Sequence, residues 1–475
     1  MVIVRTSRLF KLCFAGIVVT LFLMMVSRKG ISQRTGYVGY ITLYPRSEKD
    51  IVDVEQDYTE NEYVEVTTSR IIDEKMPGAF LRSIPPVKQT NKSYCKFNYG
   101  LPYDLKYKAR HIGFSPEIGR AGPYRIIHNV TEAWHFDGVP MVTYASHVTA
   151  NFAYYIPELL RYWDGLVSLS AFVPDLDVAM FLEQINQYCY CVPGMARVSI
   201  HLIYHKGIPM SKKDVYFTRP DDCLIQDSSK IKTHRDFDDT VVYPVNVCRN
   251  VARNSSLTKF VMVSDIQLMP SKDLARRFLQ MVDKYHKNNT GEVFVVPIFE
   301  VEETERVPRT KNELIRLLAD RKAVYFHGMV CEHCQKFPAI EKWVMSDSGK
   351  TIKPFYTVKR RFPYHRWEPI FIGTNAEPLY NEKLSWDGLQ DKMPQSLEMC
   401  LRDYDYTVLD GCFLVHWPGM KKTKIVDEEW RIPFVRDNMR EYKKILGRFY
   451  KKYKIIPQCK ILTVSKLPGF NETIN

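Results

Sequence analysis

"KFVMVSDIQLMPS", Lys259–Ser271, joins a short apolar run to a single carboxylate, Asp265. An apolar run of this length predicts a buried strand, and the following "MPSKDLARRF" predicts a helix with Ser271 as its N-cap. Asp265 would then stand at the tip of the strand, on rigid backbone that faces a crevice. A carboxylate in that position suits a divalent cation that bridges two phosphates. Gln267, two residues later, brings an amide and no charge.

Strand-like and helix-like segments alternate on both sides of this stretch. The 475 residues are 45% hydrophobic, which is enough for a large core. Predicted strands cover 139–147, 166–173, 197–205, 259–263 and 292–301; predicted helices cover 150–163, 176–188 and 271–287, and another begins near residue 244. This alternation predicts an α/β domain with a mostly parallel sheet. Ligands of such sheets bind beyond the carboxyl ends of the strands, which is where Asp265 is expected.

The helix that begins near residue 244 carries a polar face. Asn246, Arg249, Asn250 and Arg253 recur at three- and four-residue spacing and so share one side of that helix. Guanidinium and amide groups together suit a diphosphate or a ribose, which makes Asn250 and Arg253 candidate nucleotide-binding residues. A solvated polar face would give the same pattern.

A third candidate region is "LDGCFLVHWPGMKKTK", in which His416 ends an apolar run and Lys421 follows closely. An imidazole can complete a manganese coordination shell alongside carboxylate oxygens. An ammonium group at Lys421 can neutralise a departing diphosphate. The alternative for His416 is a structural role at the end of a strand.

The first residues predict a membrane anchor. Leu12–Val26 is an uninterrupted apolar run, it follows basic residues, and no cleavage signal of small residues ends it. We therefore expect a cytoplasmic tail at 1–8, an uncleaved anchor at 9–27, a flexible stem at 28–94 and a lumenal domain at 95–475. N-glycosylation sequons beyond the anchor fit a lumenal body; they begin at Asn91, Asn129, Asn254, Asn288 and Asn471.

Cysteine usage and net charge fit a lumenal protein. Of eleven cysteines, all but Cys13 follow the anchor, which suits disulfides in an oxidising compartment. In an extended stretch Cys189 and Cys191 would point the same way with one residue between them, so we expect them to pair with different partners. In "HGMVCEHC" a disulfide is favoured over a zinc site. The net charge of +13 fits an anionic substrate, and a lumenal location excludes nucleic acid as a partner.

Several segments, in this order, resemble the motifs of the family 49 glycosyltransferases: "YPVNVCRNVAR", "SDIQLMPS", "VVPIFEV", "KNELIRLL", "FHGMVCEHCQKFP", "RWEPIFI" and "GCFLVHWPG". The resemblance covers roughly residues 95–455. It implies a Golgi type II membrane enzyme with a Rossmann-like GT-A fold. The implied reaction transfers glucuronic acid from UDP-glucuronic acid, with inversion, in β-1,4 linkage to a terminal xylose on an O-mannosyl glycan of dystroglycan.

The same resemblance assigns roles to residues. Asp265 and Gln267 occupy the positions of the family's D-x-D motif, and His416 occupies the remaining position that binds Mn²⁺. Asn250 and Arg253 lie in the motif that leads into the nucleotide site. Gln267 departs from the family pattern, and because affinity for hard cations follows ligand charge, we expect weakened but surviving metal use.

An inverting transfer needs a carboxylate that accepts the proton of the acceptor hydroxyl. Glu368 in "RWEPIFI" is the first candidate, beside Trp367, which would stack on a sugar ring. Asp405 and Asp403 are alternatives, and an internal ion pair with an arginine is the structural role open to Glu368.

The predicted partners are a UDP-sugar donor, a glycan acceptor on a glycoprotein, the Golgi membrane, and other glycosyltransferase subunits, identical or different. Two other functions stay open. One is a transferase with another donor, UDP-xylose or UDP-N-acetylglucosamine. The other is a catalytically impaired carbohydrate-binding protein, which Gln267 favours.

Overall fold

The computed structural model describes residues 93–97, 110–111, 122–211, 219–221, 223, 225, 228–285, 291–330, 332–347, 349–420 and 429–459. The predicted tail and anchor, nearly all of the predicted stem, and Lys421 lie outside these ranges. Within them, no helix is both long enough and apolar enough to span a bilayer.

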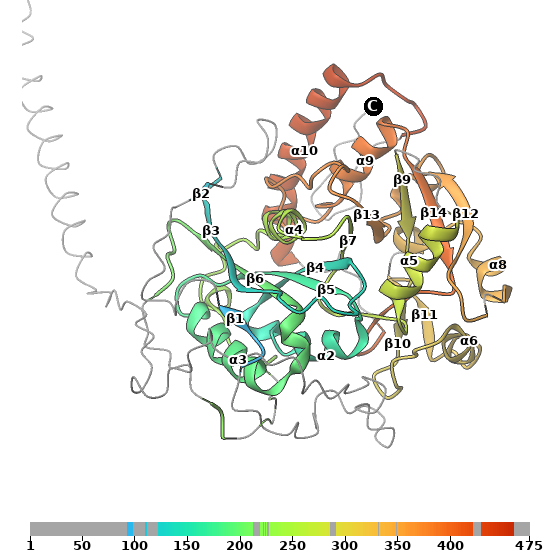
Figure 1. The fold of residues 1–475 in the computed structure, drawn as a ribbon. Helices are drawn as coiled ribbons and strands as arrows, with labels where there is room; N and C mark the ends of the chain where they lie inside the picture. Colours follow the sequence, from blue (N-terminus) through green and yellow to red (C-terminus); the bar gives the residue numbers. More distant parts are fainter. Residues whose placement is uncertain are drawn as a thin grey trace, which may run out of the picture. The chain divides into compact units, whose positions relative to one another are not determined.

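An 11-stranded sheet forms the centre of the described part of the chain, with the path order β1-β3-β6-β5-β4-β7-β13-β9-β14-β12 and β2 paired to β3 (Figure 1). Its strands are β1 Lys96–Phe97, β2 Arg110–His111, β3 Tyr124–Glu132, β4 Val142–Thr149, β5 Leu166–Phe172, β6 Val198–His205, β7 Phe260–Val263, β9 Glu292–Val295, β12 Lys353–Lys359, β13 Phe371–Gly373 and β14 Asp405–Asp410. Strands β6, β5, β4 and β7 are parallel neighbours, as predicted.

The α/β class is confirmed, but the expectation of a mostly parallel sheet is wrong. Strand β13 runs antiparallel to both β7 and β9, and β12 runs antiparallel to β14. On the other side, β3 returns antiparallel to β6. The parallel strands are thus a central block inside a mixed sheet.

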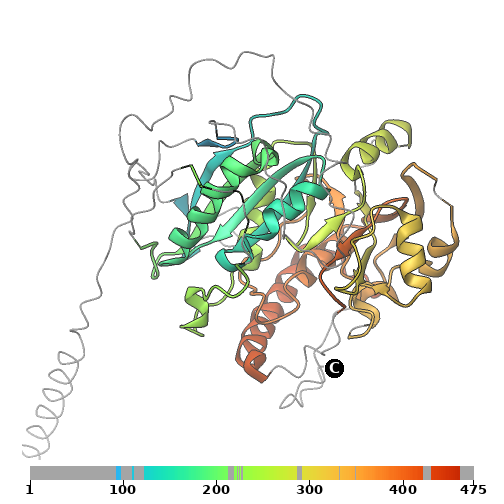
Figure 2. The same ribbon diagram turned by 90° about the horizontal axis from the view of Figure 1, so that it is seen from below.

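Helices cover both faces of the parallel block. Helix α4, Val245–Asn254, packs on one face with Phe172 and Ile203 of the sheet. Helices α2, Tyr155–Tyr162, and α3, Asp177–Cys191, lie on the other face (Figure 2). Their buried residues belong to the larger cluster, together with Leu169 and Leu202. Because side chains alternate along a strand, neighbouring residues of β5 and β6 supply both layers.

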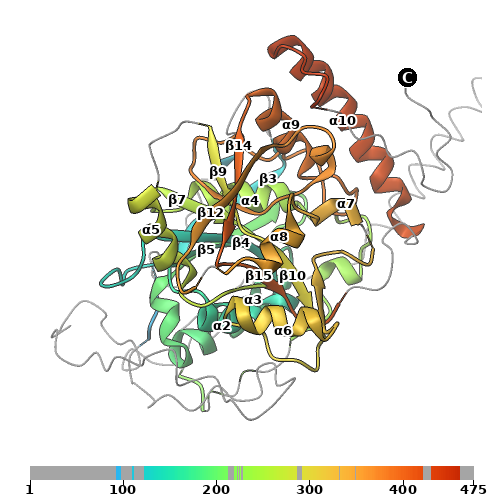
Figure 3. The same ribbon diagram turned by 90° about the vertical axis from the view of Figure 1, so that its right-hand side faces the viewer.

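The other helices are α5 Leu274–Tyr285, α6 Lys311–Ala319, α7 Glu332–Gln335, α8 Ile340–Met345, α9 Met393–Leu401 and α10 Ile432–Lys452. Helix α10 lies beside α9 (Figure 3), and the disulfide Cys400–Cys459 joins α9 to the segment that follows α10.

A second, 4-stranded sheet has the order β11-β10-β15-β8. Its strands are β8 Leu268–Pro270, β10 Ile298–Val301, β11 Ala323–Tyr325 and β15 Leu414–His416. The single strand predicted at 292–301 is therefore two strands in two sheets. The break falls at Pro297, whose ring nitrogen cannot donate to a sheet ladder.

Ser271 does not cap α5, contrary to the sequence prediction. The Asp164 carboxylate instead accepts from the backbone N–H groups of Ala275 at 2.9 Å and Arg276 at 3.0 Å. The Ser271 hydroxyl accepts from the Phe413 N–H at 3.2 Å and so ties β8 to the segment before β15. A cap from a distant residue cannot be seen in the local sequence.

The described cysteines follow the expected pattern in part. Cys189 pairs with Cys95 and Cys191 pairs with Cys223, which confirms that these neighbours have different partners. Cys334 of the C-x-x-C segment is disulfide-bonded, in line with the structural role predicted for it. Cys248 and Cys412 are buried free thiols.

Candidate functional site

The predicted strand-end position of Asp265 is confirmed, and two further side chains share its edge of the sheet. Asp265 follows the carboxyl end of β7, and His147 lies near the carboxyl end of β4, which is parallel to β7. Strand β13 runs the other way beside β7, so the residues just before β13, including Glu368, lie at this same edge.

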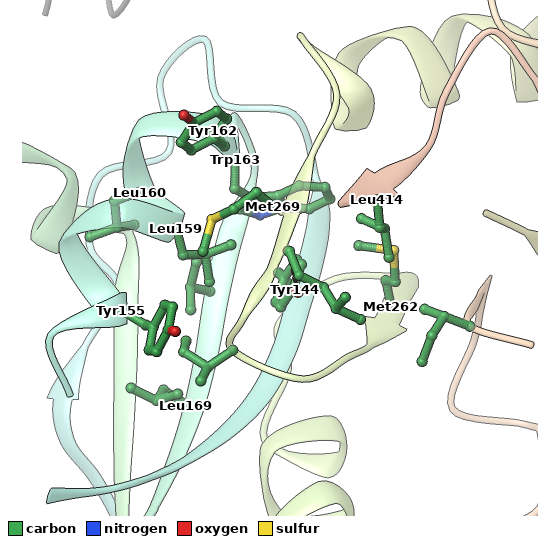
Figure 4. Packing of buried hydrophobic residues seen from close by; sticks show 14 of the residues in the cluster. Tyr144, Tyr155, Leu159, Leu160, Tyr162, Trp163, Leu169, Met262, Met269 and Leu414 are labelled. Carbon is green, nitrogen blue, oxygen red and sulfur yellow. Dashed lines mark hydrogen bonds between the residues drawn. The ribbon is translucent and has the colours of Figure 1, made fainter. Parts of the chain in front are cut away.

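The connection from β7 to β8 is held in one shape by the sheet beneath it. The Tyr144 hydroxyl is within hydrogen-bonding distance of two backbone carbonyls, at 2.8 Å from Asp265 O and 2.9 Å from Leu268 O. The Ser264 N–H donates to Ala145 O at 3.0 Å, and the Leu268 N–H donates to Asp265 O at 3.1 Å. Figure 4 shows Tyr144 packed beside this connection, between Trp163 and Met262. The backbone that carries Asp265 is therefore rigid.

Two cationic side chains and one imidazole surround the Asp265 carboxylate. One oxygen, Oδ1, lies 3.3 Å from His147 Nε2 and 3.5 Å from an Arg249 guanidinium nitrogen, and Oδ2 lies 3.9 Å from Lys392 Nζ. Burial opposes ionisation, but Lys392, the His147 hydrogen bond and Arg249 together outweigh it and hold the pKa of Asp265 well below its usual range. Asp265 is a fixed negative charge at any physiological pH.

His147 is a neutral spacer between Asp265 and Tyr243. Burial lowers the pKa of His147, and this effect exceeds the opposing effect of Asp265. Since the Asp265 carboxylate only accepts, Nε2 carries the proton. Nδ1, 2.8 Å from the Tyr243 hydroxyl, then accepts from it. The chain Tyr243–His147–Asp265 orients the carboxylate without adding charge.

The polar face predicted from the sequence is present on α4, and it packs against the segment 374–391. The Asn246 amide donates to Asn381 O at 2.8 Å and to Asp391 O at 2.9 Å. Arg249 donates to the Asp391 carboxylate and also reaches Asp265. The helix therefore brings residues near position 391 to the strand-end carboxylate.

Asn250 and Arg253 lie on the same buried face and bind protein groups. The Asn250 amide donates to Tyr380 O at 2.8 Å and to Glu382 at 3.0 Å, and its oxygen accepts from the Tyr380 N–H. Arg253 donates to the carbonyls of Pro378, Glu377 and Thr374 at 2.8–2.9 Å. These contacts give both residues a scaffold role behind the site, in place of the nucleotide contact expected from the sequence.

Lys392 enters the site from the residue before α9. Its side chain is 16% exposed, and its nearest carboxylate oxygen, on Asp265, is 3.9 Å away. Within the described part of the chain, no acceptor lies at hydrogen-bonding distance from Lys392 Nζ. Its charge nevertheless acts to lower the pKa of four neighbouring groups, namely Asp265, His147, Glu368 and Tyr380. Lys392 is thus the cation at the centre of the site.

Glu368 is half-buried, and its backbone is fixed at both ends. Its N–H donates to Cys334 O at 2.8 Å, and its carbonyl accepts from the Gln335 amide at 2.8 Å. Burial raises the pKa of Glu368 and nearby Asp391 adds to this, while Lys392 acts in the opposite direction. The Glu368 carboxylate accordingly belongs to the same electrostatic cluster as Asp265.

Trp367 cannot stack on a sugar, contrary to the sequence prediction. It is 1% exposed and packs against Tyr406, with ring centroids 6.0 Å apart. Its indole supports the position of Glu368 from the core.

Asp405 and Asp403 lie at the opposite edge of the sheet. Asp405 begins β14, which is parallel to β9 and, through β13, runs in the same direction as β7. Its carboxylate lies 3.0 Å from Lys359 Nζ, and Asp403 binds Arg361 at 2.6 Å. The prediction that either is catalytic therefore does not agree with the strand directions.

The strand pairing brings His416 next to the β7–β8 connection. His416 on β15 is the register partner of Leu268, the residue after Gln267. The ring of His416 is half-buried and lies 5.4 Å from the ring of Phe326. The Gln267 amide nitrogen donates to the Tyr155 hydroxyl at 3.1 Å. The strand register therefore places His416 opposite the residue that follows Gln267, and a common metal site of Asp265, Gln267 and His416 stays a prediction.

A family model described as "Glycosyl-transferase for dystroglycan" matches residues 141–454, which is more than half of the 475-residue chain. The chain belongs to this family. The resemblance seen in the sequence motifs is thereby confirmed, and the matched region contains every described residue of the site.

Proteins with sequences similar to this chain include two kinds of enzyme. Beta-1,4-glucuronyltransferase 1 of Danio rerio is 28% identical over 285 residues, which cover 57% of this chain and 65% of that protein. The Homo sapiens protein of the same name is 26% identical over 323 residues, or 66% of this chain and 74% of that one. Xylosyl- and glucuronyltransferase LARGE1 of Mus musculus is 22% identical over 278 residues, which cover 58% of this chain and 31% of that protein. The chain therefore spans just under two thirds of the zebrafish relative.

Among solved structures, the chain is similar to a crystal structure of GalNAc-T7 with UDP, GalNAc and Mn2+, at a TM-score of 0.36 and 7% identity, covering 66% of this chain and 51% of that one. A similarity of this size establishes neither the fold nor the site.

The predicted manganese ligands of this family member carry only one negative charge. The Gln267 amide and an imidazole ligand add none, and both oxygens of Asp265 already face positive groups or an N–H. Hard divalent cations bind tightly where several anionic oxygens converge. In the part of the chain that is described, no three His, Cys, Asp or Glu side chains are grouped to hold a metal. The residues present do not fit a resident Mn²⁺ site.

Sequence reasoning missed three members of the site: His147, Asp391 and Lys392. His147 ends a predicted strand, so the argument used for Asp265 could have found it. Asp391 and Lys392 stand in an irregular segment, "WDGLQDK", whose sequence shows no period and no motif. Their place follows from the contacts of α4, which only the structure shows.

The scaffold role of Arg253 gives a testable outcome. Arg253→Met removes a buried guanidinium and leaves the Pro378, Glu377 and Thr374 carbonyls without that donor, so we expect a loss of about 3 kcal/mol in the free energy of unfolding. UDP affinity of the folded protein should stay within about twofold, which is a small fraction of one tenfold step. Chemical denaturation and calorimetric titration with UDP measure the two quantities.

The matched control is Arg277→Met. Arg277 also donates to three backbone carbonyls, of Lys350, Lys272 and Gly411, but in a more exposed setting, so the loss should be about 1 kcal/mol. If Arg253→Met instead weakened UDP binding strongly while stability was unchanged, Arg253 would be a nucleotide ligand.

Proposed function

We propose that this chain is an inverting, UDP-sugar-dependent glycosyltransferase with a GT-A arrangement, and that its donor is UDP-glucuronic acid. The observation that carries the proposal is the convergence of Asp265, Lys392 and Glu368 at the carboxyl edge of the parallel strands. Ligands of α/β sheets bind at such edges. Membership of a glycosyltransferase family and similarity to glucuronyltransferases support the choice of reaction and donor.

The chemistry needs one group that accepts a proton and another that stabilises the leaving group. In the proposed step, the acceptor hydroxyl attacks the anomeric carbon from the face opposite to the diphosphate. The new carbon–oxygen bond forms as the bond to the diphosphate oxygen breaks, and UDP leaves with that electron pair. Glu368 takes the hydroxyl proton, and Lys392 and Arg249 stabilise the charge that develops on the diphosphate. Mn²⁺ is left out of this proposal because the donor set does not fit it.

Glu368 is preferred over another carboxyl group with a raised pKa. Burial raises the pKa of Glu382 to about 7, and the Asn250 hydrogen bond opposes that rise. Neither Lys392 nor Asp265 influences the pKa of Glu382. The pKa of Glu368, in contrast, is influenced by Lys392, Asp391 and Arg249. Glu368 is therefore the carboxyl group closer to the positive groups that would hold the donor.

Two exposed tryptophans near this edge are proposed to bind the acceptor glycan. Trp386 and Trp430 are 42% and 50% exposed, with ring centroids 6.4 Å apart. The buried Arg431 guanidinium lies 4.0 Å and 4.4 Å from the two rings and fixes their positions. An exposed, pre-positioned aromatic face suits the apolar face of a sugar ring. The proposed acceptor is a xylose-terminated O-mannosyl glycan of the dystroglycan type.

These tryptophans connect to the site through Tyr243. The Trp386 N–H donates to Tyr243 O at 3.4 Å, and the Tyr243 N–H donates to Asp387 at 2.9 Å. The hydroxyl of the same tyrosine reaches His147. Tyr243 therefore links the backbone of Trp386 to His147, the group that binds Asp265.

The proposed location is the Golgi membrane, as a single-pass type II protein. The support is the apolar run Leu12–Val26 with basic residues before it, and the paired cysteines, which need an oxidising compartment. The tail at 1–8, anchor at 9–27, stem at 28–94 and lumenal domain at 95–475 are the proposed divisions.

A carbohydrate-binding protein without transferase activity is the second candidate, and the neutral Gln267 in the D-x-D position is the observation that favours it. The deciding experiment incubates the full chain with UDP-glucuronic acid, UDP-xylose or UDP-N-acetylglucosamine and follows UDP release with and without a xyloside acceptor. We expect xyloside-dependent release with UDP-glucuronic acid. Release with another donor would change the substrate, and binding without any release would support the second candidate.

The role of Glu368 predicts a pH dependence. Because the pKa of Glu368 is raised, its carboxylate becomes protonated at a higher pH than an ordinary glutamate, so the transfer rate should fall as the pH decreases through that raised pKa. Glu368→Gln should lower turnover by at least about 100-fold, the usual contribution of a general base, and leave UDP affinity unchanged. Rates across a pH series and UDP titrations measure these effects.

Glu382→Gln is the matched control, since Glu382 is also a half-buried carboxyl group with a raised pKa. It should keep both turnover and the acidic limb of the pH profile. If the limb disappeared in Glu382→Gln and remained in Glu368→Gln, the base would be Glu382.

The aromatic surface predicts an acceptor-specific defect. Trp386→Ala should raise the KM for the xyloside about three- to tenfold, the value of one aromatic contact, with UDP affinity unchanged. Trp386→Phe should restore part of the loss. Tyr285→Ala, which removes an equally exposed aromatic ring at the end of α5, is the control. An unchanged KM in Trp386→Ala would exclude this surface as the acceptor site.

A further inference from the structure

We propose that Lys392, together with Arg249, binds the diphosphate of the donor in place of a divalent cation, so that nucleotide binding and transfer persist when metal ions are removed. This inference rests on the proposed function, because it names the groups that hold the UDP moiety at the same site.

The first observation is the burial of the Lys392 ammonium group and its hydrogen bonding. A largely buried ammonium group normally donates hydrogen bonds to a carboxylate or to carbonyls, because an unpaired buried charge is costly. Lys392 is 16% exposed, yet its nearest carboxylate oxygen is 3.9 Å away, which is beyond hydrogen-bonding distance. Lys311 shows the usual arrangement in the same molecule, since its ammonium donates to Trp343 O at 2.6 Å and to Asp410 at 2.7 Å. Lys392 is thus ion-paired with Asp265 at long range but makes no hydrogen bond within the described residues, so its N–H groups can donate to an anionic ligand.

The position of Lys392 is the second observation. Its Nζ faces the carboxylate that, in the D-x-D position, would otherwise hold a cation next to the diphosphate. Arg249, 3% exposed, approaches the same carboxylate at 3.5 Å from α4. Two cationic groups from different parts of the chain therefore stand where a metal ion would place its charge.

The balance of charge is the third observation. Arg249 and Lys392 match the charges of Asp265 and Asp391, and Glu368 adds at most one further negative charge. A divalent cation would add positive charge next to Arg249 and Lys392, and the neutral Gln267 brings no carboxylate to receive it. A diphosphate, in contrast, brings the negative charge that an ammonium and a guanidinium group bind strongly.

The test measures UDP binding to the full chain by calorimetry, in excess EDTA and in millimolar Mn²⁺. For the unmodified chain we expect dissociation constants within about threefold of each other, less than one tenfold step of 1.4 kcal/mol. Lys392→Gln should weaken UDP binding in EDTA at least tenfold, the loss of one charge-assisted contact. Uridine, which has no phosphate, should bind both proteins equally.

Three variants complete the test. Lys392→Arg keeps the charge and should retain UDP binding in EDTA, which excludes misfolding as the cause of the Lys392→Gln defect. Lys359→Gln removes a lysine at the opposite edge of the sheet, next to Asp405, and should change nothing. Gln267→Asp supplies the missing carboxylate and should bind UDP about tenfold more tightly with Mn²⁺ than with EDTA.

The outcomes separate this inference from the proposed function. UDP binding by the unmodified chain in Mn²⁺ but not in EDTA would overturn the inference and leave the transferase proposal standing. Equal UDP affinity in Lys392→Gln and the unmodified chain would also overturn it. A chain that binds no uridine nucleotide in either condition would overturn the proposed function itself.

Discussion

The contact between the polar face of α4 and the segment 374–391 is the constraint on which the site depends. Asn246 and Arg249 bind this segment near Asp391, and Asn250 and Arg253 bind it farther back. All four side chains of α4 are buried, so removing a partner leaves an unsatisfied group in a low-dielectric interior. The segment has little regular structure of its own, and α4 gives it a single position. That position places Lys392 next to Asp265, although the two residues are far apart in the sequence.

The second support of the site is the sheet itself. Asp265 lies in a connection that Tyr144 and Ser264 bind to β4, and the strand β8 that follows pairs with β15. Because the short strands β8 and β15 form part of a separate sheet, the chain between β7 and β8 crosses from one sheet to the other at Asp265. The Asp265 carboxylate at this crossing is partly exposed, and the backbone hydrogen bonds beneath it hold its position.

The sequence was informative wherever the signal is local. Asp265 follows an apolar run, and the four-residue spacing along α4 puts its polar side chains on one face; both features are present. What that face binds depends on a segment more than a hundred residues away, so spacing alone could not distinguish a nucleotide from protein carbonyls. The same limit explains Asp405, which the sequence offered as an alternative general base but which lies at the opposite edge of the sheet. Pro297 is a different case, since its missing N–H is a local signal for the break between β9 and β10, yet one strand was predicted across it.

A lysine and a metal ion neutralise a diphosphate in different ways, and the structure bears on that difference. A bound metal ion is exchangeable, carries two charges and fixes phosphate oxygens by coordination, whereas an ammonium group carries one charge and is permanently present. With Arg249 beside it, Lys392 brings the local charge to a comparable value, and the rigid α4 contact supplies the orientation that coordination would otherwise give. Under this arrangement a second carboxylate at position 267 would be unfavourable, because it would compete with the phosphates for Lys392. The neutral Gln267, bound to the Tyr155 hydroxyl, is then the residue expected beside a fixed cation.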